Sequence, residues 1–431
     1  MFTTLRNAFK IPELRKKLLF TLFILIIFRL GSHIPVPFMD SEAMKSFVTG
    51  GTGADLFALM DAFTGGAFSN ATIFAMGITP YINASIIMNL LTVAIPALER
   101  LAKEGEEGRK KINQITRYTG IGLAFIQAAG LYVTLKNSGA VPNATWMKFF
   151  VITLSFTAGT AFIMWLGEKI TEFGVGNGIS LIIFAGIVSR IPAAVGSMFK
   201  QYFADGFNMV GALQLLAVAV IAVVAIAFVV MFNNAERRIN VQYAKRVVGR
   251  KMYGGQSSNI PIKVAMAGVI PIIFASSIMA FPATIYRMFT GANPTGFWAA
   301  FFNVLSPSHW FYAVLYFLLI IFFTYFYTSI QFNPIEMSNN LKRNGGFIPG
   351  IRPGKPTSDF ITKILNRVTL AGAVFLAIIA VLPILVSPVF GLSSGIAIGG
   401  TSLLIIEGVA LETVKQIESQ MLMRHYKGFL E

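Results

Sequence analysis

The chain contains no cysteine among its 431 residues, which excludes disulfide bonds, thiolate catalysis and cysteine-ligated metal sites. It has only three histidines, His33, His309 and His425, and their wide spacing indicates no metal cluster. It also lacks a Gly-x-x-x-x-Gly-Lys-Ser/Thr motif, so any ATP-driven work requires a partner that binds the nucleotide. We therefore expect no metal, no other cofactor and no catalytic residues in this chain.

Charge is also scarce, because only 13% of the residues are charged whereas 55% are hydrophobic, with a mean hydropathy of +0.68. Such a composition is typical of a polytopic membrane protein. At roughly 20 apolar residues per spanning helix, the chain can form about ten membrane spans. The expected spans are residues 18–36, 71–95, 118–136, 148–166, 178–196, 209–232, 263–283, 309–331, 368–387 and 397–414.

The net charge of +16 indicates orientation more than nucleic-acid binding, because the cations are unevenly distributed. Most Lys and Arg residues lie before the first span, in the loops at 233–263 and 332–367, or in other segments on the same side, including the tail at 416–431. The positive-inside rule places these segments, and both termini, in the cytoplasm. The exceptions are Arg29, Lys45, Lys136, Lys148, Arg190, Lys200 and Arg287. We expect Arg29, inside the first span, to face protein or to snorkel.

The pattern of spans predicts two halves, residues 1–196 and 197–415, with five spans each. Spans two and seven contain Pro80 and Pro271, and spans five and ten both follow Gly-rich stretches. Because five is an odd number, the halves have opposite topology, an arrangement that places a transport pathway at their interface.

Residues 74–91 combine an apolar stretch with the polar residues Asn83, Ser85 and Asn89, so one face must avoid lipid. Just before it, Asp55–Phe63 predicts a helix about half a bilayer long. Gly65 and Gly66 end that helix and suit a hinge, since glycine has no Cβ. A short helix beside a span with a wet face is a combination that a gated pore needs.

Six separated segments resemble the bacterial SecY family, the central subunits of the Sec protein-conducting channel. They are Gly77–Ile87, Gly174–Ser180, Arg238–Arg246, Ala267–Pro271, Phe347–Gly354 and Gly399–Ile405. The resemblance covers essentially the whole chain in matching order. It implies an all-α fold of ten transmembrane helices in two inverted five-helix halves, with a short plug helix and a lateral gate to lipid. It also implies a bacterial cytoplasmic membrane protein that translocates unfolded preproteins and inserts membrane proteins.

The resemblance assigns roles to particular residues. The pore ring corresponds to Ile82, Ile86, Ile179, Ile183, Ile273 and Ile405. The plug corresponds to about 55–66, with Phe57, Leu59, Met60, Phe63, Gly65 and Gly66. The lateral gate lies between span two and spans seven and eight, with Asn89, Ser276 and Ser277 as polar contacts. Residues for docking a motor or ribosome are Arg237, Arg238, Lys245, Arg246, Arg250, Lys342, Arg343, Arg352 and Lys355.

The implied partners are SecE-like and SecG-like small membrane subunits, a SecA-type motor ATPase, the ribosome, signal peptides, unfolded preproteins and membrane lipids. Each assignment has a simpler alternative. The isoleucines are also typical core residues, the short helix could be a re-entrant cap, the polar residues could form ordinary interhelical hydrogen bonds, and the basic loops could set topology or bind anionic lipid.

The alternative function is a secondary transporter with inverted repeats, which usually needs ionisable groups at mid-membrane. Only Glu407 favours it: it stands where the family resemblance predicts an apolar residue, and it is interpreted as facing a partner or being protonated. An intramembrane protease would need a catalytic pair of aspartates, a Ser–His pair or a His-Glu-x-x-His motif, and no such set lies within the expected spans.

Overall fold

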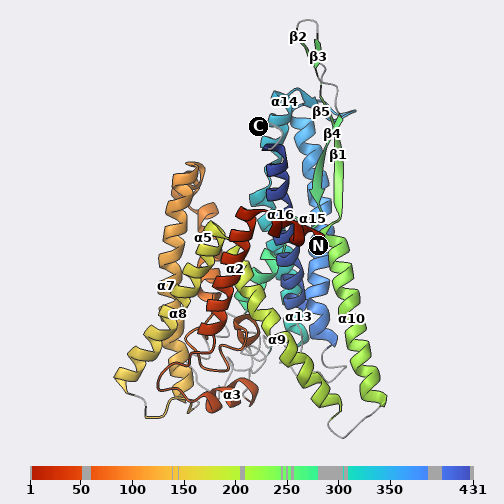
Figure 1. Ribbon diagram of the computed structural model, residues 1–431. Coiled ribbons are helices and arrows are strands. Elements are labelled where there is room, and N and C mark those ends of the chain that lie inside the picture. The colour runs from red at the N-terminus through yellow and green to blue at the C-terminus, as the bar shows by residue number, and fades with distance from the viewer. Residues whose placement is uncertain are drawn as a thin grey trace.

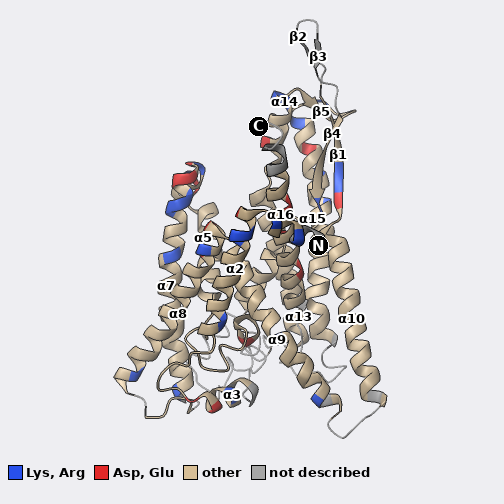
Figure 2. Cartoon of the chain, in the orientation of Figure 1, with Lys and Arg blue, Asp and Glu red and all other residues tan. Residues whose placement is uncertain are grey.

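The structure is a bundle of long helices with a small β-sheet at one end (Figure 1). This computed structural model describes residues 2–50, 60–137, 139–143, 145–203, 209–243, 246–248, 251–253, 257–279, 304, 309–386 and 400–427. The α1 helix and the C-terminal end of α16 both lie toward the end that carries the sheet (Figure 1). Charged side chains gather toward this end, and the helix middles carry few of them (Figure 2).

The first half of the chain forms α1 (Phe2–Lys10), α2 (Pro12–Gly31), α3 (Ser41–Gly50), α5 (Thr79–Ala94), α6 (Pro96–Lys103), α7 (Glu106–Asn137), α8 (Trp146–Phe173) and α9 (Gly178–Tyr202). The α5 helix packs on α7, α7 on α8, and α8 on both α2 and α9. Pro80 lies in the first turn of α5, where its fixed φ favours a helix start. Ile95 separates α5 from α6, which begins at Pro96, and the two helices meet at a bend of 99°.

The second half forms α10 (Met209–Asn233), a short apolar helix at Ile270–Met279, α13 (Trp310–Gln331), α14 (Pro334–Arg343), α15 (Lys355–Val386) and α16 (Gly400–Lys427). The α13 helix packs on α15, and α15 on both α14 and α16. The halves meet where α9 contacts α10 and α16, and where α1 contacts α16.

Among the described residues, the strands lie in the two long loops. A three-stranded antiparallel sheet has the order β4 (Ser257–Lys263), β1 (Glu236–Tyr243), β5 (Gly346–Phe347). A second hairpin, β2 (Arg246–Val248) with β3 (Lys251–Tyr253), extends beyond it (Figure 1). Because β1 comes from the first loop and β5 from the second, the two loops fold as one unit.

The polytopic α-helical fold is confirmed. Among the described residues, six helical stretches are long and apolar enough to cross a membrane, and the bent α5–α6 pair passes as a seventh. The α2 helix, the 270–279 helix and α16 lie at the other three expected spans, and the count of ten crossings stays a prediction.

Some predicted boundaries are wrong. Span one ends as a helix at Gly31, not at residue 36, and residues 71–78 are turns where a helix was expected. Their backbone pairs instead with the chain after α2: Val36 N–H donates to the Ala71 carbonyl, and Ile73 N–H to the Ile34 carbonyl. Span seven becomes helical only at residue 270, because Lys263 still belongs to β4.

Candidate functional site

The six isoleucines of the expected pore ring gather at the junction of the two halves. We call them the isoleucine cluster; they are Ile82 and Ile86 on α5, Ile179 and Ile183 on α9, Ile273 in the 270–279 helix, and Ile405 on α16. Five of them share one apolar core, in which Ile183 and Ile405 are buried. The sixth, Ile86, is buried in the neighbouring core, and Ile82 contacts both cores. Residues more than 300 positions apart therefore meet at one place.

The start of α9 fixes two members of the isoleucine cluster. Asn177 caps this helix, since its Oδ1 accepts hydrogen bonds from the N–H groups of Ile179 and Ser180 at 3.1 and 3.3 Å. Ile179 and Ile183 are four residues apart and therefore project from the same face of α9. Their branched aliphatic side chains give water no hydrogen-bond partner, so a constriction made of them resists wetting.

The segment expected to act as the plug is described from Met60 onward; Phe57 and Leu59 lie outside the described residues. We call residues 60–66 the 60–66 segment. It is helical from Met60 to Thr64 and ends where Gly65 and Gly66 adopt φ of +67° and +89°. A Cβ on Gly65 would lie 3.0 Å from the Gly186 Cα on α9, so both its φ and the available space require glycine. Met60 packs against a buried core of the first half, and Phe63 packs against the core that contains Ile183 and Ile405.

Polar contacts hold the 60–66 segment against α2 and α9. Arg190 on α9 forms an ion pair with Asp61 through Nη1 and Oδ2. The other carboxylate oxygen of Asp61 accepts from the Ser69 N–H at 2.8 Å, and the residue is only 1% exposed. Arg29 on α2 donates from Nη1 to the Gly65 carbonyl at 3.2 Å and to Ser189 Oγ at 2.9 Å. The expectation that Arg29 faces protein is confirmed.

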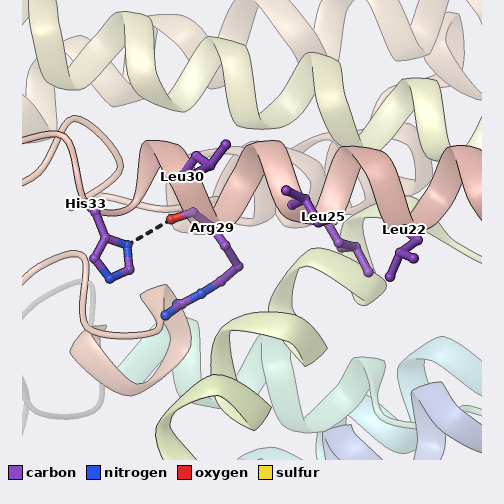
Figure 3. A pocket seen from close by; sticks show the side chains of 6 residues that line it. Leu22, Leu25, Arg29, Leu30 and His33 are labelled. Carbon is purple, nitrogen blue, oxygen red and sulfur yellow. Dashed lines mark hydrogen bonds between the residues drawn. The ribbon is translucent and has the colours of Figure 1, made fainter.

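Arg29 also lines an open groove along α2 (Figure 3). The groove has a volume of about 520 Å³ and is lined by Leu22, Leu25, Ile26, Arg29, Leu30 and His33. Nδ1 of His33 lies 2.9 Å from the Arg29 carbonyl oxygen, one turn back along the helix. The guanidinium bends away from α2 in this view, toward the contacts that it makes with Gly65 and Ser189.

The residues expected at the lateral gate lie on two elements that share one apolar core. Ile86 of α5 is buried there among residues of the 270–279 helix and α13. Asn89 is exposed, Ser277 is buried, and the Ser276 hydroxyl donates to the Ile273 carbonyl of its own helix at 2.9 Å. The hydrogen bonds described for these residues do not join Asn89 to either serine. The gate assignment stays a prediction.

The expected docking cations lie on the unit formed by the two long loops. Arg237 and Arg238 are exposed on β1, Lys342 and Arg343 on α14, and Arg352 and Lys355 on the turn that leads into α15. Arg246 begins β2, whereas Lys245 and Arg250 lie outside the described residues. A buried apolar core supports the unit, with Ile239, Val241, Ile262, Leu341, Ile348, Ile361 and Leu365.

Hydrogen bonds to the Arg352 and Gly354 carbonyls hold the turn that carries Arg352. The Thr357 hydroxyl donates to the Arg352 carbonyl at 2.9 Å, and the Ser338 hydroxyl of α14 donates to the Gly354 carbonyl at 2.7 Å. Gly350 and Gly354 adopt φ of +82° and +103°, which permit the tight turn. The backbone is thus fixed while the guanidinium remains exposed.

Glu407 has a partner that the sequence did not reveal. It is 7% exposed on α16, and its Oε2 accepts a hydrogen bond from the Asn233 side chain at the end of α10. Its Oε1 is buried without a hydrogen-bond partner among the described residues. Nearby, Lys415 donates to Oδ1 of Asn234, the residue directly after α10, at 2.9 Å. Glu407 therefore contributes to α10–α16 packing.

The contacts of Asp61, Arg190 and Ser189 were not inferred from the sequence. A signal was present, because Asp61 and Arg190 are isolated charges in apolar segments, and such charges usually pair. Their partners could not be deduced, since 129 residues separate the two.

A sequence model of the SecY family matches residues 72–414. The chain belongs to the SecY family. The protein translocase subunit SecY of Halalkalibacterium halodurans is 48% identical over 438 residues, and that of Bacillus subtilis is 46% identical over 439; each alignment covers 100% of both chains. This chain is thus a SecY-family membrane protein along its full length.

Solved SecY-type structures share the fold. A structure on the plug domain of SecY, described as stabilising the closed state of the translocation channel, superposes with a TM-score of 0.65 at 19% identity. A protein-conducting channel superposes with a TM-score of 0.61 at 18% identity, and both alignments cover 96% of each chain. Sec61 in a canine ribosome–channel complex gives a TM-score of 0.56 at 17% identity over 96% of both chains.

Proposed function

We propose that this chain is the central subunit of a protein-conducting channel in the bacterial cytoplasmic membrane. It passes unfolded preproteins outward and releases apolar segments sideways into lipid. The observation that carries the proposal is the isoleucine cluster at the junction of the halves, in a chain 48% identical to a protein translocase subunit over its full length. The secondary-transporter alternative is not favoured, because the relatives are named as translocase subunits.

The chemistry of the isoleucine cluster suits this function. A ring of aliphatic side chains imposes a desolvation barrier on ions, yet it offers no hydrogen bonds that would hold a passing chain. Apolar contacts have no preferred direction, so the ring can yield to side chains of different shape. In this proposal the 60–66 segment seals the outer side of the constriction as a plug, and the contact of α5 with the 270–279 helix and α13 opens as the lateral gate.

The proposed orientation follows from the distribution of charge. The unit formed by the two long loops carries many of the cations, so the positive-inside rule places it, α1 and the end of α16 in the cytoplasm. Residues 1–196 and 197–415 then form the inverted halves, and residues 416–431 the cytoplasmic tail.

The proposed partners supply what this chain lacks. Energy comes from a SecA-type motor ATPase or from the ribosome, which dock on the exposed cations of β1, α14 and the Arg352 turn. SecE-like and SecG-like subunits complete the membrane complex. The chain itself performs no catalysis.

The experiment that tests this function is ATP-driven preprotein import into vesicles that contain the chain, a SecE-like subunit and a SecA-like motor. Arg352→Glu reverses a charge on a fixed, exposed turn, and reversing a desolvated interfacial charge typically costs about 2–5 kcal/mol of binding. We expect this variant to melt like the parent and to lose import, and Arg352→Lys to be intermediate because lysine lacks the planar fork of donors. Lys136→Glu, which reverses an exposed cation that is not assigned to docking, is the control. Import that survives in Arg352→Glu, or is lost equally in both, would exclude this turn as the docking site.

A further inference from the structure

The ion pair between Asp61 and Arg190 differs from those at the protein surface. The pairs Lys103–Glu99, Arg117–Glu168 and Arg238–Glu236 have both partners at least 28% exposed. In contrast, the Asp61 carboxylate is 1% exposed, whereas Arg190 is 36% exposed and reaches it from α9. A buried carboxylate that loses its cation is strongly unfavourable, whereas an exposed one is resolvated at little cost.

Two further contacts fix the position of the same segment. The Arg29 guanidinium links the Gly65 carbonyl to Ser189 Oγ, and Ser189 is the residue directly before Arg190. The backbone of the segment also lies directly on α9: a Cβ on Gly186 would lie 2.5 Å from the Phe63 carbonyl oxygen. The segment is therefore held by one ion pair, by the hydrogen bonds of the Arg29 guanidinium and by one close backbone contact. All three involve residues 186–190 of α9.

These contacts have a directional geometry that apolar packing lacks. A shift of the 60–66 segment by one helical residue, about 1.5 Å, would stretch the hydrogen bonds of both guanidiniums at once. Because the carboxylate is buried, a partly shifted segment would keep the cost of desolvation while it loses the compensating charge. The segment therefore has a well-defined seated position and no stable intermediate close to it.

We propose that Arg190 and Arg29 are positioning residues that latch the 60–66 segment onto α9, and that opening of the channel requires rupture of the Asp61–Arg190 ion pair. This inference rests on the proposed function, because a latch matters only where the segment moves. It assigns to two arginines within the membrane-embedded part a gating role that neither hydropathy nor the isoleucine cluster explains.

The test is resting conductance in planar bilayers for the purified channel complex with single and double substitutions. Arg190→Gln leaves Asp61 buried without a cation, so we expect conductance to rise about tenfold or more. Asp61→Asn keeps a side-chain oxygen that can accept from the Ser69 N–H, so we expect its conductance to be lower than that of Arg190→Gln. Asp61→Asn/Arg190→Gln should leak less than Arg190→Gln alone, because no uncompensated charge remains. Lys200→Gln, an exposed cation on the same helix, should match the parent.

The order of the variants tests the role of the ion pair: a double variant at least as leaky as Arg190→Gln, or equal conductance in Arg190→Gln and Lys200→Gln, would overturn the proposal. A rise in conductance at a temperature where Arg190→Gln is still fully folded distinguishes a latch from simple loss of stability. Thermal unfolding of all variants provides the second readout, and we expect the midpoint of Asp61→Asn/Arg190→Gln to lie close to that of the parent.

A cross-link tests whether the segment must move. The parent has no cysteine, so Asp61→Cys/Arg190→Cys carries the only thiols in the chain. A short bis-methanethiosulfonate reagent should join them, keep conductance at the closed level and block preprotein import until a reductant cleaves it. Absence of a cross-link, or import that continues through it, would contradict the latch. Failure of the parent to import would instead overturn the proposed function, while the conductance series, which needs no substrate, would still report on the latch.

Discussion

The isoleucine cluster and the neighbouring 60–66 segment are held in place by different kinds of contact. The isoleucine cluster joins α5, α9, the 270–279 helix and α16 through apolar contact alone. The 60–66 segment lies against the same α9 helix through hydrogen bonds and an ion pair in addition to the apolar contact of Phe63. Apolar contact is non-directional, so its partners can separate around a chain and close again in slightly different arrangements. Directional polar contacts define one seated position. A gate that must yield and a seal that must return to one place therefore need different chemistry.

The largest effect should come from making the isoleucine cluster polar. Ile86→Asn or Ile405→Asn places an amide without a partner in an apolar core, which should destabilise the closed state by about 2–4 kcal/mol. We expect water to enter and resting ion conductance to rise by about tenfold or more in planar bilayers. Ile405→Val keeps the site apolar and is the control. Parental conductance in both asparagine variants would remove the basis for a dry gate.

A smaller effect should come from the hinge of the 60–66 segment. Gly65→Ala meets both an unfavourable φ and the Gly186 backbone, whereas the nearest atom to a Cβ on Gly66 is 3.8 Å away. Gly66→Ala should therefore cost only the left-handed conformation, about 1–2 kcal/mol, and Gly65→Ala measurably more. Thermal unfolding together with conductance measures the difference.

Gly105→Ala provides the matched surface control for this pair, because its φ is +85° and nothing lies within 4 Å of a Cβ there. We expect it to lower stability as Gly66→Ala does without raising conductance. If Gly65→Ala and Gly105→Ala behaved alike, the close approach of the segment to α9 would have no functional consequence.

The smallest effect should come from an exposed ion pair between two helices. Arg117 donates from Nε to Glu168 Oε1 at 3.0 Å and from Nη2 to the second oxygen, which joins α7 to α8 at their charged ends. The side chains of Arg117 and Glu168 are 45% and 28% exposed, so solvent screens their attraction. Arg117→Gln should lower stability by about 0.5–1 kcal/mol, less in high salt, and should not change conductance. A tenfold leak from this variant would show that any ion pair in the first half controls the channel.

The helices and the isoleucine positions were accessible from sequence, because long apolar runs and the family motifs are local signals. The strands of the first long loop were missed although a local signal existed: Ile239 and Val241 are buried and alternate with exposed residues, a period of two. The cations around them led us to describe this segment only as a long basic loop in the cytoplasm. The β5 strand that pairs with β1 lies about a hundred residues further along the chain, so this pairing could not be deduced from the local sequence.

The turns at residues 71–78 show a different limit. Their apolar composition favours a helix, but Thr72 pairs with Pro35 and Gly77 adopts a φ of +57°. Tertiary backbone pairing therefore overrides local preference. The contacts of Asp61, Arg190 and Arg29 are likewise tertiary, and sequence could indicate only that such isolated charges need partners.

The central claim, that an unfolded polypeptide passes through the isoleucine cluster, is tested most directly by site-specific cross-linking. Single cysteines placed by Ile86→Cys, Ile183→Cys or Ile405→Cys in this cysteine-free chain should form disulfides with a cysteine in a preprotein stalled during import when a thiol oxidant is added. Leu213→Cys, on the exposed surface of α10, is the control. We expect cross-links from the three cluster positions, dependent on the motor and ATP, and none from residue 213. Equal cross-linking at all four positions, or none at the cluster, would contradict a pathway through the isoleucines.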